Sequence, residues 1–170
     1  MNSNKNIVFL GMMGSGKSSI GNLVSKKLNI PFIDIDYLIE EHVGMSISEI
    51  FKNNGEDYFR NLEEKITLKT LKNNKSVIAL GGGGFINDKI RKDILLKHFS
   101  FWLDWDESIL LKRIRGSKKR PLAFKSTDKE IKAIIKKRAK IYSKAQFKIN
   151  CNKLTKTEII NKIIKIYELN

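Results

Sequence analysis

Cysteine, histidine and proline are scarce, with one, two and two copies among 170 residues. The single cysteine, Cys151, excludes an internal disulfide framework, and the isolated His42 and His98 form no cluster with zinc-site spacing. No apolar run approaches the ~18 residues of a transmembrane helix. The apolar run at residues 7–10 is too short for the core of a signal peptide. These absences predict a protein of a reducing compartment, which we expect to be the cytoplasm.

Acidic residues are outnumbered, because 33 lysines and arginines face 18 aspartates and glutamates, for a net charge of +15. Such an excess can indicate an anionic partner or a lysine-rich composition. The lysines are spread along the chain and form no stripe interleaved with aromatic residues, which argues against a nucleic-acid-binding surface. We therefore interpret most of the excess as composition.

Short apolar segments alternate with segments of helical spacing throughout the chain. The expected strands are 6–10, 31–35, 76–80, 100–103 and 146–150, and the expected helices are 19–28, 36–43, one opened by Ser46, 56–71, one from 87 or 88 to 98, 108–114, and two opened by Thr127 and Thr155. This alternation predicts an α/β fold: a five-stranded, mainly parallel sheet flanked by helices in three layers, as a single domain over residues 1–170.

A complete phosphate-loop motif, G-x-x-x-x-G-K-[ST], occupies Gly11–Ser18 between the first strand and the first helix. Its backbone N–H groups and the following helix N-terminus are suited to bind a phosphate chain. Lys17 is expected to reach the β- and γ-phosphates, and the Ser18 hydroxyl to ligate Mg²⁺. The residues predicted to bind ATP here are Gly14, Ser15, Gly16, Lys17, Ser18 and Ser19.

A magnesium-holding acid is expected at the end of another strand, and two places qualify. Asp34 and Asp36 end the second strand, and both would project on one side if the strand continued through them. Asp104 ends the fourth strand, with Asp106 beyond it as the simplest N-cap of the next helix. We favour Asp34 and Asp36, because the second strand follows the first helix directly and should lie near the phosphate loop.

Four glycines, Gly81–Gly84, follow the third strand at the end where α/β sheets bind ligands. Their bare backbone permits close approach and offers N–H groups to a carboxylate or hydroxyl. Only six arginines occur, and one of them, Arg120, lies in a basic loop broken by Pro121. A mobile loop there could close over ATP and bring cations to the transferring phosphoryl group.

Taken in order, these motifs resemble the shikimate kinase family over nearly the whole chain. The residues that carry the resemblance are Gly11–Ser18, Asp34-Ile-Asp36, Phe59-Arg60-x-x-Glu63, Gly81-Gly-Gly83, Arg120-Pro-Leu122 and Arg138. The resemblance implies a P-loop, nucleoside-monophosphate-kinase-like fold, with a substrate-binding helical region at about 34–63 and a lid at about 115–126. It also implies ATP-dependent phosphorylation of the shikimate 3-hydroxyl, with Mg²⁺ as cofactor.

The resemblance further implies a role for individual residues. Asp36 would bind the shikimate hydroxyls and be the candidate base, Arg60 and Arg138 would clamp the carboxylate, Gly82 and Gly83 would line the substrate site, and Asp34 would hold Mg²⁺ through its water shell. Arg120 and Lys17 would meet the phosphates, Arg113 would pack near adenine, and residues 150–152 fall where an adenine loop should be. We expect ATP and shikimate as the only partners of a monomer, without nucleic acid or membrane.

The residues alone leave two other hypotheses about function open. One is a nucleoside monophosphate kinase or gluconate-type kinase, because a fold does not determine the phosphoryl acceptor. The other is a P-loop protein that binds nucleic acid through its positive charge, which would show salt-steep affinity for polynucleotides.

Overall fold

The computed structural model describes residues 4–73, 75–116 and 126–170. Its elements are β1 (Ile7–Leu10), α1 (Lys17–Leu28), β2 (Phe32–Asp34), α2 (Ile35–Val43), α3 (Ile47–Thr70), β3 (Val77–Ala79), the 3₁₀ turn η1 (Gly84–Ile86), α4 (Asp88–Lys97), β4 (Phe99–Asp104), α5 (Glu107–Arg115), α7 (Asp128–Tyr142), β5 (Phe147–Asn150) and α8 (Lys156–Glu168). All five expected strands are present, and within the described residues no helix is both long and apolar enough to cross a membrane.

The five strands form one sheet in the order β2-β3-β1-β4-β5, and every neighbouring pair is parallel. The expected α/β fold with a parallel sheet is therefore confirmed. The second strand, however, does not border the first, because β3 lies between them. The chain crosses over one strand position before β2 pairs, a strand order that the sequence analysis did not specify.

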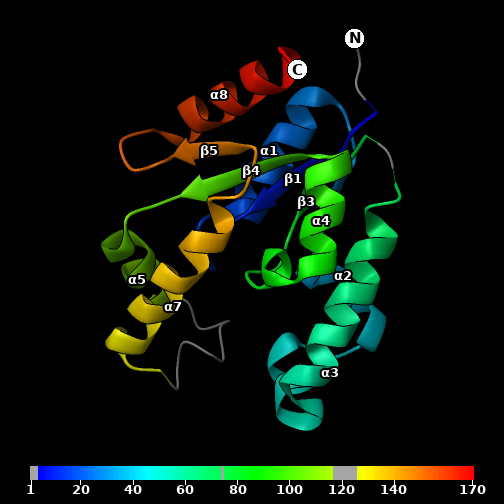
Figure 1. Cartoon of the computed structure of the whole chain (residues 1–170), viewed down its shortest axis with the longest axis vertical. Coiled ribbons are helices and arrows are strands. Elements are labelled where there is room, and N and C mark those ends of the chain that lie inside the picture. The colour runs from blue at the N-terminus through cyan, green and yellow to red at the C-terminus, as the bar shows by residue number, and fades with distance from the viewer. Residues whose placement is uncertain (1–3, 74, 117–125) are drawn as a thin grey trace.

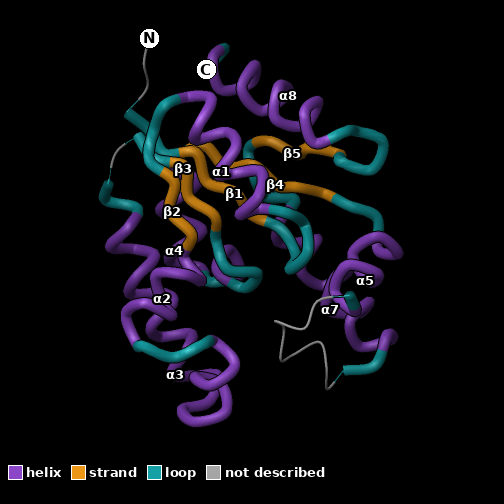
Figure 2. The backbone as a smooth tube through the Cα atoms, turned by 180° about the vertical axis from the view of Figure 1, so that it is seen from behind, coloured by secondary structure: helices purple, strands orange, loops and turns teal. Residues whose placement is uncertain are grey.

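Helices cover both faces of the sheet, which makes three layers (Figures 1 and 2). Alternate strand residues point to opposite faces. Ile7 and Phe9 of β1 pack in an apolar cluster with α1 and α8, whereas Val8 and Leu10 pack in a second cluster with residues of α2, α3, α4 and α7. The two clusters together form the core that holds the strand ends in place.

Capping signals in the sequence locate most helix starts. Capping boxes open α3 at Ser46, α7 at Thr127 and α8 at Thr155, and the Asn87 side chain caps α4. Asp106 stands at the N-cap position of α5, but its side chain makes no capping hydrogen bond. Its backbone N–H donates instead to Asn152 Oδ1 (2.6 Å).

Gly55 interrupts α3, as the sequence Asn53-Asn-Gly55 predicts. Its backbone has φ 84° and ψ 173°, a conformation open essentially only to glycine. The segment after it, from Glu56 onward, carries Arg60 and Glu63. In Figure 1 the helices α2 and α3 project on one side below the sheet, and α5 and α7 on the other.

Candidate active site

The phosphate loop leaves the carboxyl end of β1 and enters α1 at Lys17. The N-cap of α1 is Gly16, with φ 87°, and within the described chain no side chain caps this helix start. No acidic residue occurs in the first turn either. The helix start therefore offers backbone N–H groups and the positive end of the helix dipole to an anion.

Lys17 lies folded back over the loop. Its side chain is largely buried, and Nζ donates to the carbonyl oxygens of Gly11 (2.9 Å) and Met12 (3.2 Å). Ser15 is fully buried, whereas Ser18 and Ser19 are exposed at the first turn of α1. The Ser19 hydroxyl accepts a hydrogen bond from Lys156 Nζ at 3.2 Å. The structure thus gathers the six residues predicted to bind ATP around one helix start, with Lys156 beside them.

Asp34 and Asp36 do not sit on one continuous strand. The strand ends at Asp34, whose Oδ1 accepts from the backbone N–H groups of Asp36 (3.0 Å) and Tyr37 (3.4 Å) and so caps α2. Asp36 belongs to the first helical turn. The argument from strand alternation was therefore wrong, because capping by Asp34 turns the chain into a helix before Asp36.

Asp36 occupies an environment that disfavours its charge. Burial raises its pKa from 3.8 to about 6; Lys17 lowers the pKa, while the charges of Asp34, Glu63 and Glu40 raise it further. The opposing effect of Lys17 places Asp36 within electrostatic reach of the phosphate-loop lysine. A carboxyl group with a pKa close to neutrality can accept a proton from a hydroxyl group.

The glycine run is required by the charged side chains that crowd against it. A Cβ atom on Gly81 would lie 2.5 Å from Glu63 Oε1 and 2.6 Å from Asp36 Oδ1, and one on Gly83 would collide with Arg60 Nη1. Glycine permits such close approach because it has no Cβ atom. The groups that approach these glycines are carboxylates and a guanidinium of the chain itself. The glycine run therefore connects the end of β3 to the charged residues of the site.

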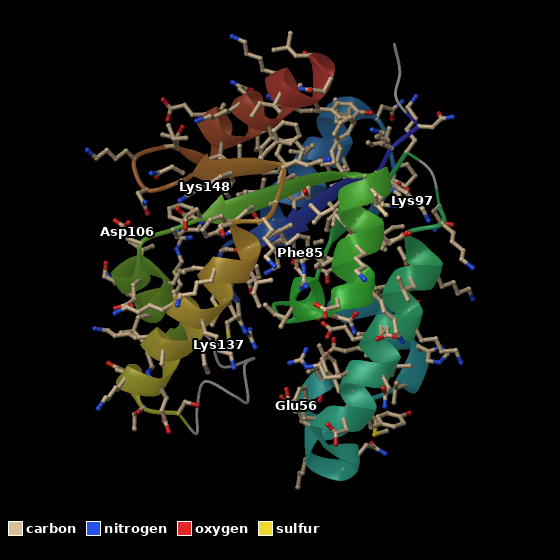
Figure 3. All side chains as sticks on the ribbon, viewed as in Figure 1. Glu56, Phe85, Lys97, Asp106, Lys137 and Lys148 are labelled. Carbon is tan, nitrogen blue, oxygen red and sulfur yellow. The ribbon has the colours of Figure 1, made fainter. Side chains whose placement is uncertain are left out.

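Arg60 is held by two glutamates on its own helix. Its Nη1 donates to Glu63 Oε2 (2.7 Å), and its Nε and Nη2 both donate to Glu56 Oε1 (3.2 Å each). Glu63 is almost fully buried, and its Oε1 has no hydrogen-bond partner within the described residues. Figure 3 places Glu56 on the part of α3 farthest from the sheet.

Glu63 received no role from the sequence, although it belongs to the Phe59-Arg60-x-x-Glu63 motif. Its three-residue spacing from Arg60 within a helix is the signal that could have identified the pair. A buried carboxylate oxygen without a partner is costly, which is why such an atom at the edge of a site points to a group that is bound there.

Arg138 approaches the same run of glycines from α7. Its Nη1 donates to the Gly82 carbonyl (3.1 Å), which also accepts from the Tyr142 hydroxyl. Burial raises the pKa of Tyr142 to about 12, so this hydroxyl keeps its proton. Arg138 also lines a small pocket with Met12, Met13, Ile114, Ser126, Ile131 and Ile134. The two arginines predicted to clamp a carboxylate thus contact neighbouring glycines from opposite sides.

Arg113 lies on the other flank of the phosphate loop. Its guanidinium stacks on the Trp105 ring, with Cζ 3.8 Å from the ring centroid, and its Nη1 donates to the Gly14 carbonyl (3.3 Å). Trp105 Nε1 donates to the Ser15 carbonyl (2.9 Å). Sequence reasoning did not identify Trp105. The loop 150–152 lies alongside, since Cys151 N donates to the Asp104 carbonyl (2.9 Å).

Arg120, together with residues 117–125 of the expected lid, falls outside the described residues. Within the described ranges, no group of three or more His, Cys, Asp or Glu side chains is arranged to hold a metal ion. The site therefore comprises the phosphate loop, the Asp34–Asp36 turn, the Arg60–Glu63 pair, the glycine run and Arg138.

The family model described as shikimate kinase matches residues 13–168 of this chain. The shikimate kinase of Thermodesulfovibrio yellowstonii is 41% identical over 165 residues, covering 96% of this chain and 95% of that protein. A solved structure of shikimate kinase from Acinetobacter baumannii in complex with shikimate superimposes with a TM-score of 0.91 at 27% identity, covering 98% of this chain and 94% of that one. The structure of shikimate kinase from Aquifex aeolicus has a TM-score of 0.85 at 36% identity, covering 96% of both chains. From this match over nearly its full length, together with the site geometry, the chain belongs to the shikimate kinase family.

Proposed function

We propose that this protein transfers the γ-phosphoryl group of ATP to the 3-hydroxyl group of shikimate, giving shikimate 3-phosphate and ADP. The observation that supports it most is the convergence of Asp36, Arg60 and Arg138 on three consecutive glycines, within electrostatic reach of Lys17. This set offers two cations for a carboxylate and one carboxylate for hydroxyl groups. Shikimate, an acid with ring hydroxyls, matches both.

The nucleotide is bound by residues 14–19. The helix start and the loop N–H groups hold the phosphate chain, and Lys17 turns from the Gly11 and Met12 carbonyls toward the β- and γ-phosphates. Arg120 adds a second cation at the transferring group, and Arg113 lies at the adenine side. Lys17 and Arg120 stabilise the negative charge that develops in the transition state.

The acceptor is positioned by the arginine pair. Arg60 and Arg138 bind the carboxylate, Gly82 and Gly83 line the ring, and Asp36 binds the hydroxyl that reacts. Once that hydroxyl is in line with the γ-phosphoryl group, positioning removes much of the barrier. The proton of the hydroxyl passes to Asp36, whose pKa of about 6 leaves it ionised at neutral pH.

The residues near the phosphate loop fit a magnesium ion. Mg²⁺ in kinases keeps several waters and is bound by one or two side-chain oxygens plus the phosphates, so it needs no cage of acids. Ser18 is exposed at the helix start, and both capping bonds of Asp34 use Oδ1, so that within the described chain Oδ2 has no donor. We assign Ser18 as ligand and Asp34 as holder of the water shell; when bound, the ion neutralises phosphate charge.

The same proposal assigns regions to the two substrates. Residues at about 34–63 form the shikimate-binding helical region, residues at about 115–126 form the lid, and the whole chain is one domain. Every residue assigned a role belongs to one copy of the chain, so the chemistry needs no second subunit.

An assay of ADP release tests the acceptor. With MgATP present, we expect turnover with shikimate and background rates with gluconate, AMP and CMP. A Lys17→Ala variant, checked for folding by circular dichroism, serves as the control and should abolish the release. Absence of turnover with shikimate would reject the proposal, and turnover with a nucleotide acceptor would favour the nucleoside monophosphate kinase reading.

A further inference from the structure

Trp105 connects three segments that surround the nucleotide side of the site. It lies in the connection between β4 and α5, partly buried and packed against both apolar clusters of the core. Its neighbours in sequence are both bonded to the loop after β5: the Asp104 carbonyl accepts from Cys151 N (2.9 Å), and Asp106 N donates to Asn152 Oδ1 (2.6 Å). The backbone at Trp105 is thus held on both sides.

The indole of Trp105 holds the phosphate loop in turn. Its Nε1–H donates to the Ser15 carbonyl at 2.9 Å, in a partly buried position where an indole N–H needs a partner. Ser15 is fully buried in the middle of the motif. A hydrogen bond to this carbonyl orients the peptide unit between Ser15 and Gly16, whose N–H group belongs to the set that faces the phosphates.

The same ring supports Arg113. The guanidinium lies 3.8 Å above the ring centroid, a distance that corresponds to a close stack, and Nη1 reaches the Gly14 carbonyl (3.3 Å). Stacking fixes the plane of a side chain that is otherwise exposed and flexible. One face of the guanidinium is covered by indole, so a planar base can stack only on the opposite face.

We propose that Trp105 is a nucleotide-positioning residue, which orients the phosphate loop through Ser15 and sets the plane of Arg113 against which the base of the nucleotide stacks. This inference rests on the proposed function in taking a purine nucleoside triphosphate as the phosphoryl donor and in placing Arg113 at the adenine side. It assigns Trp105 no contact with the acceptor. Trp105 therefore affects the binding of the nucleotide, through Arg113 and the phosphate loop.

Substitutions at Trp105 separate its two contacts. Trp105→Phe keeps a ring under Arg113 but removes the N–H donor, and we expect a KM for ATP about fivefold higher, as for the loss of one hydrogen bond. Trp105→Ala removes both contacts and should raise the KM for ATP at least tenfold. The KM for shikimate at saturating ATP should change less than twofold. The matched control is Trp102→Phe, in a residue that packs on Tyr142 and lies outside the site.

Fluorescence reports directly whether a nucleotide binds beside Trp105, whereas the KM values report whether Trp105 positions it. The chain has two tryptophans, so in the Trp102→Phe variant Trp105 is the only one. We expect MgADP to change its emission in a saturable way and shikimate alone to leave it unchanged. If Trp105→Ala fails to fold, the KM for ATP of Trp105→Phe and this titration still test whether Trp105 positions the nucleotide.

Several outcomes would overturn the inference. They are an unchanged KM for ATP in both Trp105 variants, equal rises in the KM values of both substrates, or Trp105 emission that is insensitive to saturating MgADP. A failure of the proposed function is distinguishable, because MgADP binding is measured without an acceptor. A protein that ignores shikimate yet shows the Trp105 response would lose the proposed function and keep this inference.

Discussion

Arg60 and Glu63 form a pair whose stability and binding effects can be separated. Arg60→Ala should raise the KM for shikimate by at least tenfold, because half of the carboxylate clamp is lost, while the KM for ATP stays within twofold. It should also lower the free energy of unfolding by about 3 kcal/mol, since the nearly buried Glu63 loses its cation. Steady-state kinetics and urea unfolding measure the two effects.

The double variant Arg60→Ala, Glu63→Gln is the control. It removes the unpaired charge, so it should recover most of the lost stability without recovering shikimate binding. A double variant that regains a normal KM for shikimate, or an Arg60→Ala variant with both KM values raised alike, would show that Arg60 is structural.

Asp36 links activity to pH. Its pKa of about 6 means that the carboxylate is progressively protonated as the pH falls through 6. We expect kcat/KM for shikimate to fall about tenfold per pH unit below 6, in the free enzyme that this parameter reports. Asp36→Asn should lower kcat strongly and remove that limb from the profile. A wild-type profile that is flat down to pH 5 would exclude Asp36 as the base.

The same residue links stability to pH with a defined sign. The pKa of Asp36 is raised on folding from 3.8, so the folded state binds the proton more tightly. Its favourable contribution is present below pH 3.8 and is lost as the pH rises to about 6. Asp36→Asn should therefore raise the free energy of unfolding relative to wild type by about 2 kcal/mol more at pH 8 than at pH 4. Urea denaturation at both pH values measures the difference, and equal effects would show that Asp36 ionises without cost.

Among individual residues, the sequence predicted those that belong to a strong local motif and missed those that act through contacts between distant segments. The phosphate-loop residues and the glycine run were identified because spacing and position after a strand indicate their chemistry. Trp105 and Tyr142 were not identified. Each donates to a carbonyl group that lies 90 or 60 residues away in the sequence, respectively, and no local pattern predicts such a contact.

Helix α3 depends on the break at Gly55. Alanine there would be forced into φ 84° and ψ 173° with no neighbouring atom within 4 Å to add a clash, so the cost is backbone strain alone. We expect Gly55→Ala to lower the free energy of unfolding by about 2 kcal/mol. Because the segment after the break carries Arg60, the KM for shikimate should rise several-fold and that for ATP should not.

Gly44→Ala is the control for backbone strain at a positive-φ glycine outside α3. Gly44 ends α2 with φ 71° and is equally open around its Cα, so alanine is strained there too. It should lower stability by about 1 kcal/mol and leave the KM for shikimate within twofold. Similar KM changes in both variants would mean that destabilisation, and not the direction of α3, sets shikimate binding.

At the level of elements, nearly every strand and helix start could be predicted, because capping boxes and short apolar runs are local signals. The place of β2 in the sheet could not. Sequence order alone does not determine it, because pairing depends on which edges are free when the crossover helix packs, and that is a property of the assembled core. The strand alternation argument for Asp36 failed for a similar reason, since capping by Asp34 outweighed strand propensity.

The net charge of +15 acts on the molecule as a whole. Both substrates are anions, and MgATP carries more charge than shikimate. Raising the ionic strength from about 0.05 M to about 0.5 M shortens the screening length to a few ångströms. We expect kcat/KM for MgATP to fall several-fold, that for shikimate to fall less, and added polynucleotide to leave ATP turnover unchanged. Stimulation by polynucleotide would support the nucleic-acid reading instead.

The crowding of charged groups against Gly81 and Gly83 limits how this scaffold could be redesigned. Any side chain introduced at either glycine would displace Asp36 and Glu63 or Arg60, so mutant libraries that randomise the run would be dominated by inactive members. Engineering toward a differently shaped alcohol would have to change side chains of α2 and α3, while leaving that bare segment of backbone untouched.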